Sequence, residues 1–154
     1  FTVNGEQKRV DAPETATLLD VLRNHLGLMG TRYGCGLEQC GCCMVLVDGQ
    51  PTYACTRELG TVSNAKVTTV EGLGTPAKPH PIQQAFLDVD AMQCGYCTPG
   101  QICSGVGLIA EGHAKTADEI RELMSGNICR CGCYPNIVAA IEEVMKGAAP
   151  ESAP

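Results

Sequence analysis

The sequence predicts an α+β fold in two parts, an N-terminal unit of short strands with one helix and a C-terminal unit of helices. Short strand-like runs separated by turn residues fill much of the first part, and helical periodicity begins at Pro81. Between them, residues 73–81 contain three prolines, which disfavour both helices and strand ladders. We therefore expect one domain over residues 1–74 and a second over residues 75–154.

The first predicted elements are a hairpin and a helix. Asn4-Gly5, a strong turn signal, separates Phe1–Val3 from Lys8–Val10. Thr17 is a suitable N-cap for the helix, and Gly27 is expected to end it. The apolar face of this helix is made of leucines at helical spacing: Leu18, Leu19, Leu22 and Leu26.

Three more strands complete the N-terminal unit. Met44–Val47 and Thr52–Ala54 flank an Asp48-Gly49 turn, and Lys66–Val70 follows as another short run. A hairpin, a helix and further strands in this order predict a small mixed sheet with a helix packed on it.

The C-terminal unit is predicted to hold four helices, and the first two follow the prolines directly. Four apolar residues after Pro81 share one helical face: Ile82, Ala85, Phe86 and Val89. Thr98–Gln101 combines a capping box with a proline at the first helical position, so a second helix is expected from Thr98 to about Ala110.

Two further helices and a tail complete this unit. A second capping box, Thr116–Glu119, is expected to open a helix that ends near Ser125. Pro135 opens the last predicted helix and Gly147 ends it. Residues 148–154 have nothing to pack against, and we expect them to be mobile or to lie on a partner protein.

Charge and hydropathy exclude two functional classes. Eleven lysines and arginines against 17 acidic residues give a net charge of −6, whereas a nucleic-acid-binding surface is basic. The apolar runs are short, so we expect no transmembrane segment. The first residues lack a secretory signal pattern, which favours the cytoplasm, with export beside a partner that carries the signal as the alternative.

Eleven cysteines in 154 residues dominate the composition. An odd number cannot pair completely into disulfides, and a chain without a secretory signal favours metal binding over a disulfide scaffold. The cysteines therefore predict metal sites.

Four cysteines form the predicted first set: Cys35, Cys40, Cys43 and Cys55. The first three have the C-x4-C-x2-C spacing of plant-type [2Fe–2S] proteins, and the fourth follows the predicted strand hairpin. Glycines in the same loop let the backbone pass close to a cluster. Cys42 is an arithmetical alternative to Cys43, and we choose Cys43 because it keeps this spacing.

A second set joins a C-x2-C pair to a C-x-C pair: Cys94, Cys97, Cys129 and Cys131. Cys97 precedes the predicted helix start, whose free N–H groups favour thiolates. Four thiolates suit zinc or an iron–sulfur cluster, and the C-x-C spacing, unusual for structural zinc, puts iron ahead. Cys133 is an alternative to Cys131 as a ligand. The cysteines left over are expected to be small buried residues: Cys42, Cys103 and Cys133.

Taken together, these motifs resemble the iron–sulfur subunit of the molybdenum hydroxylases, the family of xanthine oxidase, aldehyde oxidoreductase and carbon monoxide dehydrogenase. The resemblance rests on residues 34–43, 93–100 and 127–132 and covers nearly the whole chain. It implies an N-terminal β-grasp domain like plant ferredoxin and a C-terminal four-helix bundle, each with one [2Fe–2S] cluster. The chain departs from the usual pattern at Cys42, where alanine is common, and at Cys133, where threonine is common.

The resemblance also implies roles for individual residues. The second cysteine set would hold the cluster nearest a molybdopterin cofactor, and the first set would hold the outer cluster. Gln93 resembles the family residue that hydrogen-bonds the pterin, and the region of Cys131 also faces it. A separate large subunit would hold the molybdenum and the substrate, so this chain is expected to carry no catalytic residue.

An electron relay is the resulting hypothesis. Electrons would leave molybdenum singly, pass through the second set's cluster and then the first's, and reach a cytochrome, a flavin subunit or a quinone system. Arg130, between two ligands, is a candidate for raising the potential of the inner cluster, with a surface salt bridge as the plainer interpretation. Two other functions stay open: a free ferredoxin-type carrier, and a thiol–disulfide oxidoreductase that uses Cys94 and Cys97.

Overall fold

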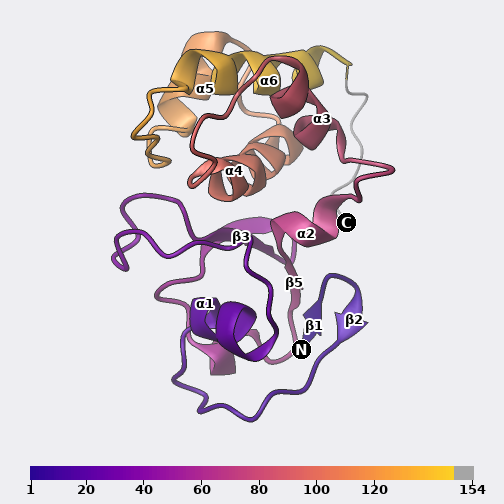
Figure 1. The fold of residues 1–154 in the computed structure, drawn as a ribbon, viewed down its shortest axis with the longest axis vertical. Helices are drawn as coiled ribbons and strands as arrows, with labels where there is room; N and C mark the ends of the chain where they lie inside the picture. The colour runs from indigo at the N-terminus through magenta and orange to yellow at the C-terminus, as the bar shows by residue number, and fades with distance from the viewer. Residues whose placement is uncertain (148–154) are drawn as a thin grey trace.

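The computed structural model of the chain describes residues 1–147, and the predicted mobile tail, residues 148–154, lies outside them. Figure 1 shows a sheet with one helix in the N-terminal half and a group of helices in the C-terminal half. The chain is therefore a mixture of helices and strands, as predicted. No helix in the described part of the chain is both long and apolar enough to cross a membrane.

Five short strands form one mixed sheet in the order β2-β1-β5-β3-β4. Their bounds are β1 Thr2–Val3, β2 Glu6–Gln7, β3 Met44–Val47, β4 Gln50–Tyr53 and β5 Lys66–Thr68. Strand β1 pairs antiparallel with β2 and parallel with β5, whereas β3 pairs antiparallel with both β4 and β5. The predicted mixed sheet is confirmed, and the β3–β4 hairpin turns at Asp48-Gly49 as expected.

The N-terminal hairpin has the predicted turn but a different second strand. Asn4 and Gly5 have φ angles of 51° and 80°, which suit a two-residue turn. Such a tight turn places Glu6 directly opposite Val3, so β2 is Glu6–Gln7, and the prediction of a strand at Lys8–Val10 is wrong.

The first helix begins and ends where the sequence predicts. It runs as α1 Leu18–Asp20 and continues without a break as the π-helix η1 Val21–His25. The Thr17 hydroxyl accepts a hydrogen bond of 3.2 Å from the Asp20 N–H, and Gly27 follows with φ +69°. Leu18, Leu19 and Leu22 are buried in the core of the N-terminal half, as the periodicity predicts, and Leu26 is partly buried against the same core.

Two short helices are not predicted: the 3-10 helix η2 Leu59–Val62 and α2 Val70–Leu73. Val70 therefore begins a helix instead of ending a strand. The cause is a contact distant in sequence, because the Asn4 side chain accepts from the Thr69 N–H at 2.9 Å and donates to the Thr69 hydroxyl at 3.0 Å. These bonds fix the chain at the start of α2.

Four helices make up the C-terminal half: α3 Pro81–Asp88, α4 Thr98–Glu111, α5 Ala117–Leu123 and α6 Tyr134–Gly147. The predicted capping box of α5 is confirmed, since Thr116 and Glu119 cap each other. The capping box predicted for α4 is wrong, because Cys97 is the N-cap and no side chain caps it. Gln101, the expected cap partner, instead donates to the backbone carbonyl of Asn127 at 3.0 Å.

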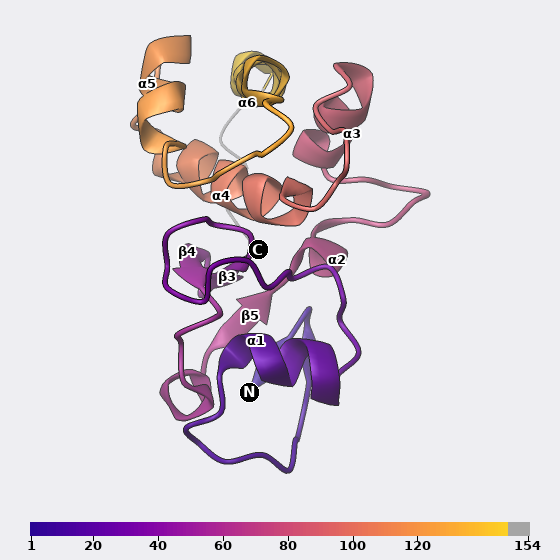
Figure 2. The ribbon, with the colours of Figure 1, turned by 60° about the vertical axis from the view of Figure 1, so that its left-hand side comes forward.

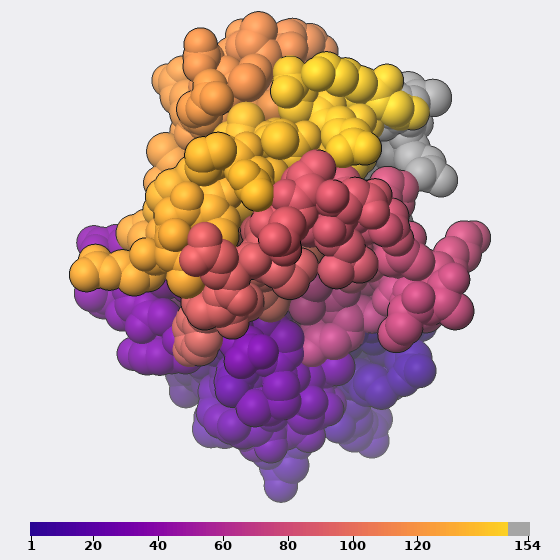
Figure 3. All heavy atoms as spheres, turned by 45° about the horizontal axis from the view of Figure 1, so that its top comes forward, coloured from indigo at the N-terminus to yellow at the C-terminus, as the bar shows by residue number. Residues whose placement is uncertain are grey.

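Helix α4 lies between the sheet and the other helices, as Figures 1 and 2 show. The buried residues form two hydrophobic clusters, and Leu46 of β3 belongs to the cluster of the helical half. A glycine on α4 allows this close approach, since a Cβ at Gly107 would lie 2.1 Å from Cγ of Pro51 on β4. In the space-filling view the two halves meet along a continuous seam (Figure 3).

Candidate metal centres

All eleven cysteines are free thiols in the structure, and every one lies within the described residues. The first set lies on the loop between η1 and β3 and just after β4, and the second set lies before α4 and between α5 and α6. Within residues 1–147, no group of three or more His, Cys, Asp and Glu side chains is placed to hold one metal ion. The thiols are instead arranged in pairs.

The first pair joins Cys35 and Cys40. The Cys40 sulfur accepts from the Cys35 N–H at 3.3 Å, and the two thiols also contact each other. The Cys35 sulfur accepts from the N–H groups of Leu37 at 3.3 Å and Gln39 at 3.2 Å. These two N–H groups lower the pKa of Cys35 to about 7, because they stabilise the thiolate. The loop therefore directs two backbone N–H groups at this sulfur, an arrangement that stabilises a thiolate.

Cys43 and Cys55 form the second pair at the open end of the β3–β4 hairpin. Cys43 precedes β3 and Cys55 follows β4, so the antiparallel ladder brings them together, and the Ala54 N–H donates to the Cys43 carbonyl at 3.2 Å. The two thiols are buried and hydrogen-bonded to each other. Burial raises the pKa of Cys43 to about 12. A metal that takes these thiols as thiolates must therefore supply the compensating positive charge.

The second set also divides into two pairs, Cys94 with Cys131 and Cys97 with Cys129. The Tyr96 N–H, 3.5 Å from the Cys94 sulfur, lowers the pKa of Cys94, and the Cys131 thiol lowers it further. Burial raises the pKa of Cys97 to about 12. Since Cys94 contacts Cys131 and not its sequence neighbour Cys97, the geometry does not favour a dithiol that exchanges disulfides.

The three cysteines outside the two sets are buried, as predicted: Cys42, Cys103 and Cys133. Cys103 is fully buried within α4, and burial raises its pKa to about 12. The Cys133 N–H donates to the Cys129 sulfur at 3.4 Å, so its backbone supports a predicted ligand. The Cys42 thiol contacts Cys40 and lies near Cys129, between the two sets.

The paired thiols fit a dinuclear iron–sulfur centre. Each iron of a [2Fe–2S] cluster takes two cysteine ligands and shares two bridging sulfides. The structure offers two thiol pairs in each half, with backbone N–H groups directed at sulfurs of both sets.

The surface around the second set is exposed and partly apolar. Gln93 and Cys94 are exposed next to each other, and Cys131 is half-buried. Large side chains surround them at the surface: Tyr96, Ile128 and Tyr134. Arg130 is exposed and, within residues 1–147, makes no salt bridge, so its predicted alternative role as an ion-pair partner is not seen.

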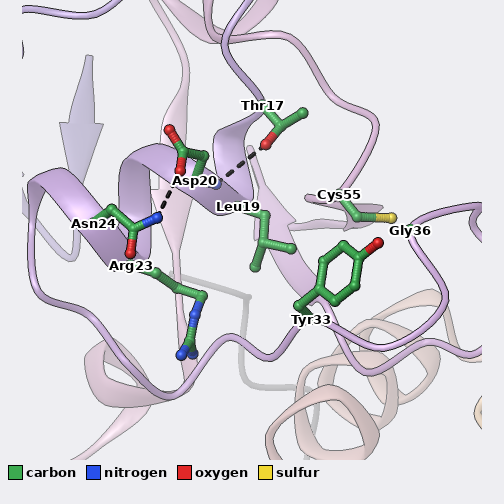
Figure 4. A pocket seen from close by; sticks show the side chains of 8 residues that line it. All are labelled: Thr17, Leu19, Asp20, Arg23, Asn24, Tyr33, Gly36 and Cys55. Carbon is green, nitrogen blue, oxygen red and sulfur yellow. Dashed lines mark hydrogen bonds between the residues drawn. The ribbon is translucent and has the colours of Figure 1, made fainter.

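A cavity of about 450 Å³ opens beside the first set (Figure 4). Leu19 and Arg23 of the first helix line one side, and Tyr33, Gly36 and Cys55 line the other. The cavity therefore reaches the first set beside Cys55, whose own side chain is buried.

Sequence reasoning missed a buried polar group at the second set. Asn127 and Gln101 are 5% and 1% exposed, and the Gln101 side-chain amide donates to the Asn127 backbone carbonyl between α4 and the Cys129 loop. The Tyr134 hydroxyl accepts from the Cys129 N–H at 2.8 Å. Asn127 lies within a cysteine motif and Gln101 on an otherwise apolar helix face, which is the one signal that could have drawn attention to them.

Two family models together match most of the chain. A model described as "2Fe-2S iron-sulfur cluster binding domain" matches residues 1–67, and one described as "[2Fe-2S] binding domain" matches residues 69–142. Each range contains one complete cysteine set.

Known proteins that resemble the chain cover it nearly end to end. The aldehyde oxidoreductase iron-sulfur-binding subunit PaoA of Escherichia coli (strain K12) is 49% identical over 156 residues, which cover 92% of this chain and 68% of that protein. The nicotinate dehydrogenase small FeS subunit of Eubacterium barkeri is 37% identical over 146 residues, which cover 95% of this chain and 93% of that protein. A chain of the crystal structure of quinoline 2-oxidoreductase from Pseudomonas putida 86 superposes with a TM-score of 0.87 and 36% sequence identity. The superposition covers 96% of this chain and 94% of that chain. The chain therefore belongs to the molybdenum hydroxylase family, as an iron–sulfur subunit with two 2Fe-2S binding domains.

Proposed function

We propose that this subunit relays single electrons from a molybdenum centre in a large partner subunit, through the second cysteine set and then the first, to an external acceptor. The observation that carries the proposal is that each half of the chain brings the thiols of one cysteine set into contact, with Cys42 beside Cys40 and Cys133 beside Cys129 as additional thiols. When bound, each [2Fe–2S] cluster takes up and releases one electron.

The ligand assignment follows from the pairs. In the first centre, Cys35 and Cys40 would hold one iron, while Cys43 and Cys55 would hold the other. In the second centre, Cys94 with Cys131 and Cys97 with Cys129 would hold the two irons. Backbone N–H groups donate to sulfurs in both centres and favour the more negative, reduced state of the cluster.

Two domains carry these centres in our proposal. Residues 1–74 form a β-grasp domain like plant ferredoxin, and the mixed sheet with the first helix packed on it supports this assignment. Residues 75–154 form the second domain, a four-helix bundle followed by the tail 148–154, and the group α3 to α6 within the described residues supports the bundle.

The exposed side of the second set is proposed to face the molybdopterin cofactor of the large subunit. Gln93 would hydrogen-bond the pterin, and Cys131 would lie beside it as a ligand. The exposed apolar side chains around this set support a protein interface here: Tyr96, Ile128 and Tyr134. The relatives named above include an aldehyde oxidoreductase and a nicotinate dehydrogenase, so an aldehyde or an N-heterocycle is the proposed substrate class of the complex.

The first set is proposed to deliver electrons to a flavin subunit or a cytochrome. The first cysteine loop supports this direction, because Leu37 and Tyr33 are 68% and 59% exposed beside it. The accessible cavity next to Cys55 leaves the same side open.

Metal analysis and low-temperature EPR of the reduced, co-purified complex test this function. We expect two distinct [2Fe–2S] signals together with a molybdenum signal. Cys43→Ser should remove one cluster signal and about half of the iron, whereas Cys42→Ser, its matched control, should keep both. Zinc in place of iron at the second set, or equal loss in the two variants, contradicts the assignment.

A further inference from the structure

One backbone hydrogen bond directly connects the two cysteine sets. The N–H of Ile128 donates to the carbonyl of Cys40 at 2.9 Å. Cys40 is in the first set, and Ile128 is bonded to Cys129 of the second. Among residues 1–147, this is the one backbone-to-backbone hydrogen bond between the Gly34–Cys43 loop and the second set's loops. The sulfurs of Cys40 and Cys129 are therefore joined by a continuous path of covalent bonds and one hydrogen bond.

Asn127, the residue before Ile128, fixes the position of the Cys40–Ile128 hydrogen bond. Its side-chain amide, 5% exposed, lies 2.9 Å from the Ser104 hydroxyl, 3.4 Å from the Gly100 carbonyl and 3.5 Å from the Gly41 carbonyl. Its backbone carbonyl accepts from Gln101 at 3.0 Å. Asn127 thus bonds to α4, to the first cysteine loop and, through its own backbone, to the second set.

Two glycines let Asn127 and the first loop approach so closely. A Cβ at Gly41 would lie 2.4 Å from the Asn127 amide nitrogen, and a Cβ at Gly100 would lie 2.1 Å from the Gly41 carbonyl oxygen. Gly41 also has φ +72°, a conformation that L side chains rarely adopt. The two backbone segments that form the Cys40–Ile128 hydrogen bond are therefore closely packed and have little room to move apart.

A competing route passes through the Cys42 thiol. This thiol contacts Cys40 and lies near Cys97 and Cys129. A route through it needs jumps across non-bonded gaps on the side of the second set. Electronic coupling decays faster across such gaps than along covalent and hydrogen bonds, so the Cys40–Ile128 path is favoured.

We infer that the Cys40–Ile128 hydrogen bond is the electron path between the two centres and that Asn127 is the positioning residue that keeps it closed. The inference rests on the proposed function, in which both sets hold [2Fe–2S] clusters. With a cluster bound at each set, one electron would pass from the second set to the first through the Cys40–Ile128 bond. No covalent bond forms or breaks, and no proton is transferred.

Asn127→Ala in the purified complex tests this inference with three measurements. Freeze-quenched EPR after rapid reduction by substrate should show that transfer between the centres is slowed about tenfold, since small displacements of an aligned group can cost factors of ten to a hundred. The magnetic interaction between the two reduced clusters should weaken. Hydrogen–deuterium exchange at Ile128 should increase, while both midpoint potentials stay unchanged.

Two control variants separate this role from general destabilisation. Asn136 also donates from its amide to two backbone carbonyls, those of Val89 and Asp90, but does so away from the seam. Asn136→Ala should leave the rate between the centres unchanged. Cys42→Ala should also leave it unchanged, and a slower rate in that variant would assign the path to the thiol and overturn the inference.

A milder variant decides the matter if Asn127→Ala does not assemble. Ser104→Ala removes only the 2.9 Å bond to Asn127 and should slow the transfer in the same direction by a smaller factor. The inference is overturned if the variant that assembles keeps the wild-type rate of electron transfer between the centres and the wild-type magnetic interaction. In that case the two cluster signals still support the proposed function. Absence of both signals from the wild-type complex overturns the function and the inference together.

Discussion

The hydroxyl of Tyr96 donates a hydrogen bond to the backbone carbonyl of Tyr33. Tyr96 lies between Cys94 and Cys97, and Tyr33 immediately precedes the first cysteine loop. The Arg32 guanidinium lies over the Tyr96 ring, 5.6 Å from its centroid, and adds a cation–π contact. The two cysteine loops are therefore connected at the molecular surface as well as in the interior.

Tyr96→Phe should lower the free energy of unfolding by about 0.5–1 kcal/mol, because it removes one hydrogen bond and keeps the ring under Arg32. Urea unfolding of the purified chain measures this change. Tyr33→Phe is the matched control, since the Tyr33 hydroxyl makes no hydrogen bond among the described residues, and its effect should be smaller. Equal effects in the two variants would mean that the Tyr96 bond adds nothing to stability.

Gly107→Ala should destabilise the seam between the halves. Its Cβ would lie 2.1 Å from the Pro51 ring, and relieving such overpacking costs about 1–3 kcal/mol. Urea unfolding is again the measurement. Gly147→Ala is the control, because no atom of residues 1–147 lies within 4 Å of a Cβ there, and it should be neutral or slightly stabilising. A Gly107 variant as stable as the wild type would show that the seam adjusts freely.

Glu119→Gln should reduce stability at neutral pH but not in acid. The Lys115 N–H at 2.7 Å and the Thr116 hydroxyl and N–H lower the pKa of Glu119 below its ordinary 4.5. A lowered carboxylate pKa stabilises the fold above pH 4.5, and this stabilisation is lost as the pH falls through the folded-state value. The difference in unfolding free energy between wild type and variant should therefore shrink toward zero as the pH is lowered.

Glu122 provides the control for this pH dependence. It lies on the same helix, and its side chain makes no hydrogen bond or ion pair among residues 1–147. Glu122→Gln should show no comparable change with pH. If both variants respond alike, the effect comes from net charge and not from the capping box.

Arg130→Gln should lower the midpoint potential of the second centre by about 10–40 mV and leave the first unchanged. This range corresponds to roughly 0.2–1 kcal/mol for an exposed charge interaction, at 59 mV per tenfold change for one electron. Redox titration followed by EPR measures both potentials. Arg121→Gln, which removes an exposed arginine on α5 paired with Asp118, should move neither. Two unmoved potentials in the Arg130 variant would dispose of its proposed role.

Features set by neighbouring residues were predictable from the sequence. The Asn4-Gly5 turn, the Thr17 cap and the Thr116 capping box depend on a few adjacent residues, and the structure confirms all three. The same reasoning failed at Thr98, because Gln101 bonds to Asn127, which is 26 residues away in the sequence. It failed again at Val70, because the preceding Thr69 hydrogen-bonds to Asn4, which is 65 residues away in the sequence.

The candidate site also has features that the sequence predicts and features that depend on contacts distant in sequence. Spacing alone groups the cysteines into two sets, but it gives no information on which thiols pair within the second set. The pairing of Cys94 with Cys131 depends on how the loop before α4 meets the loop before α6. Asn127 also escaped prediction, because its role depends on carbonyls from two distant segments.

The contact between Pro51 on β4 and Gly107 on α4 bears on how such subunits can be recombined. Leu46 of β3 packs with the helical cluster, so part of the first half's sheet completes the interior of the second. A chimera that joins the N-terminal half of one relative to the helical half of another will fold well only if these positions are inherited as a matched group. The two halves therefore share packing across their interface, even though each carries its own cysteine motif.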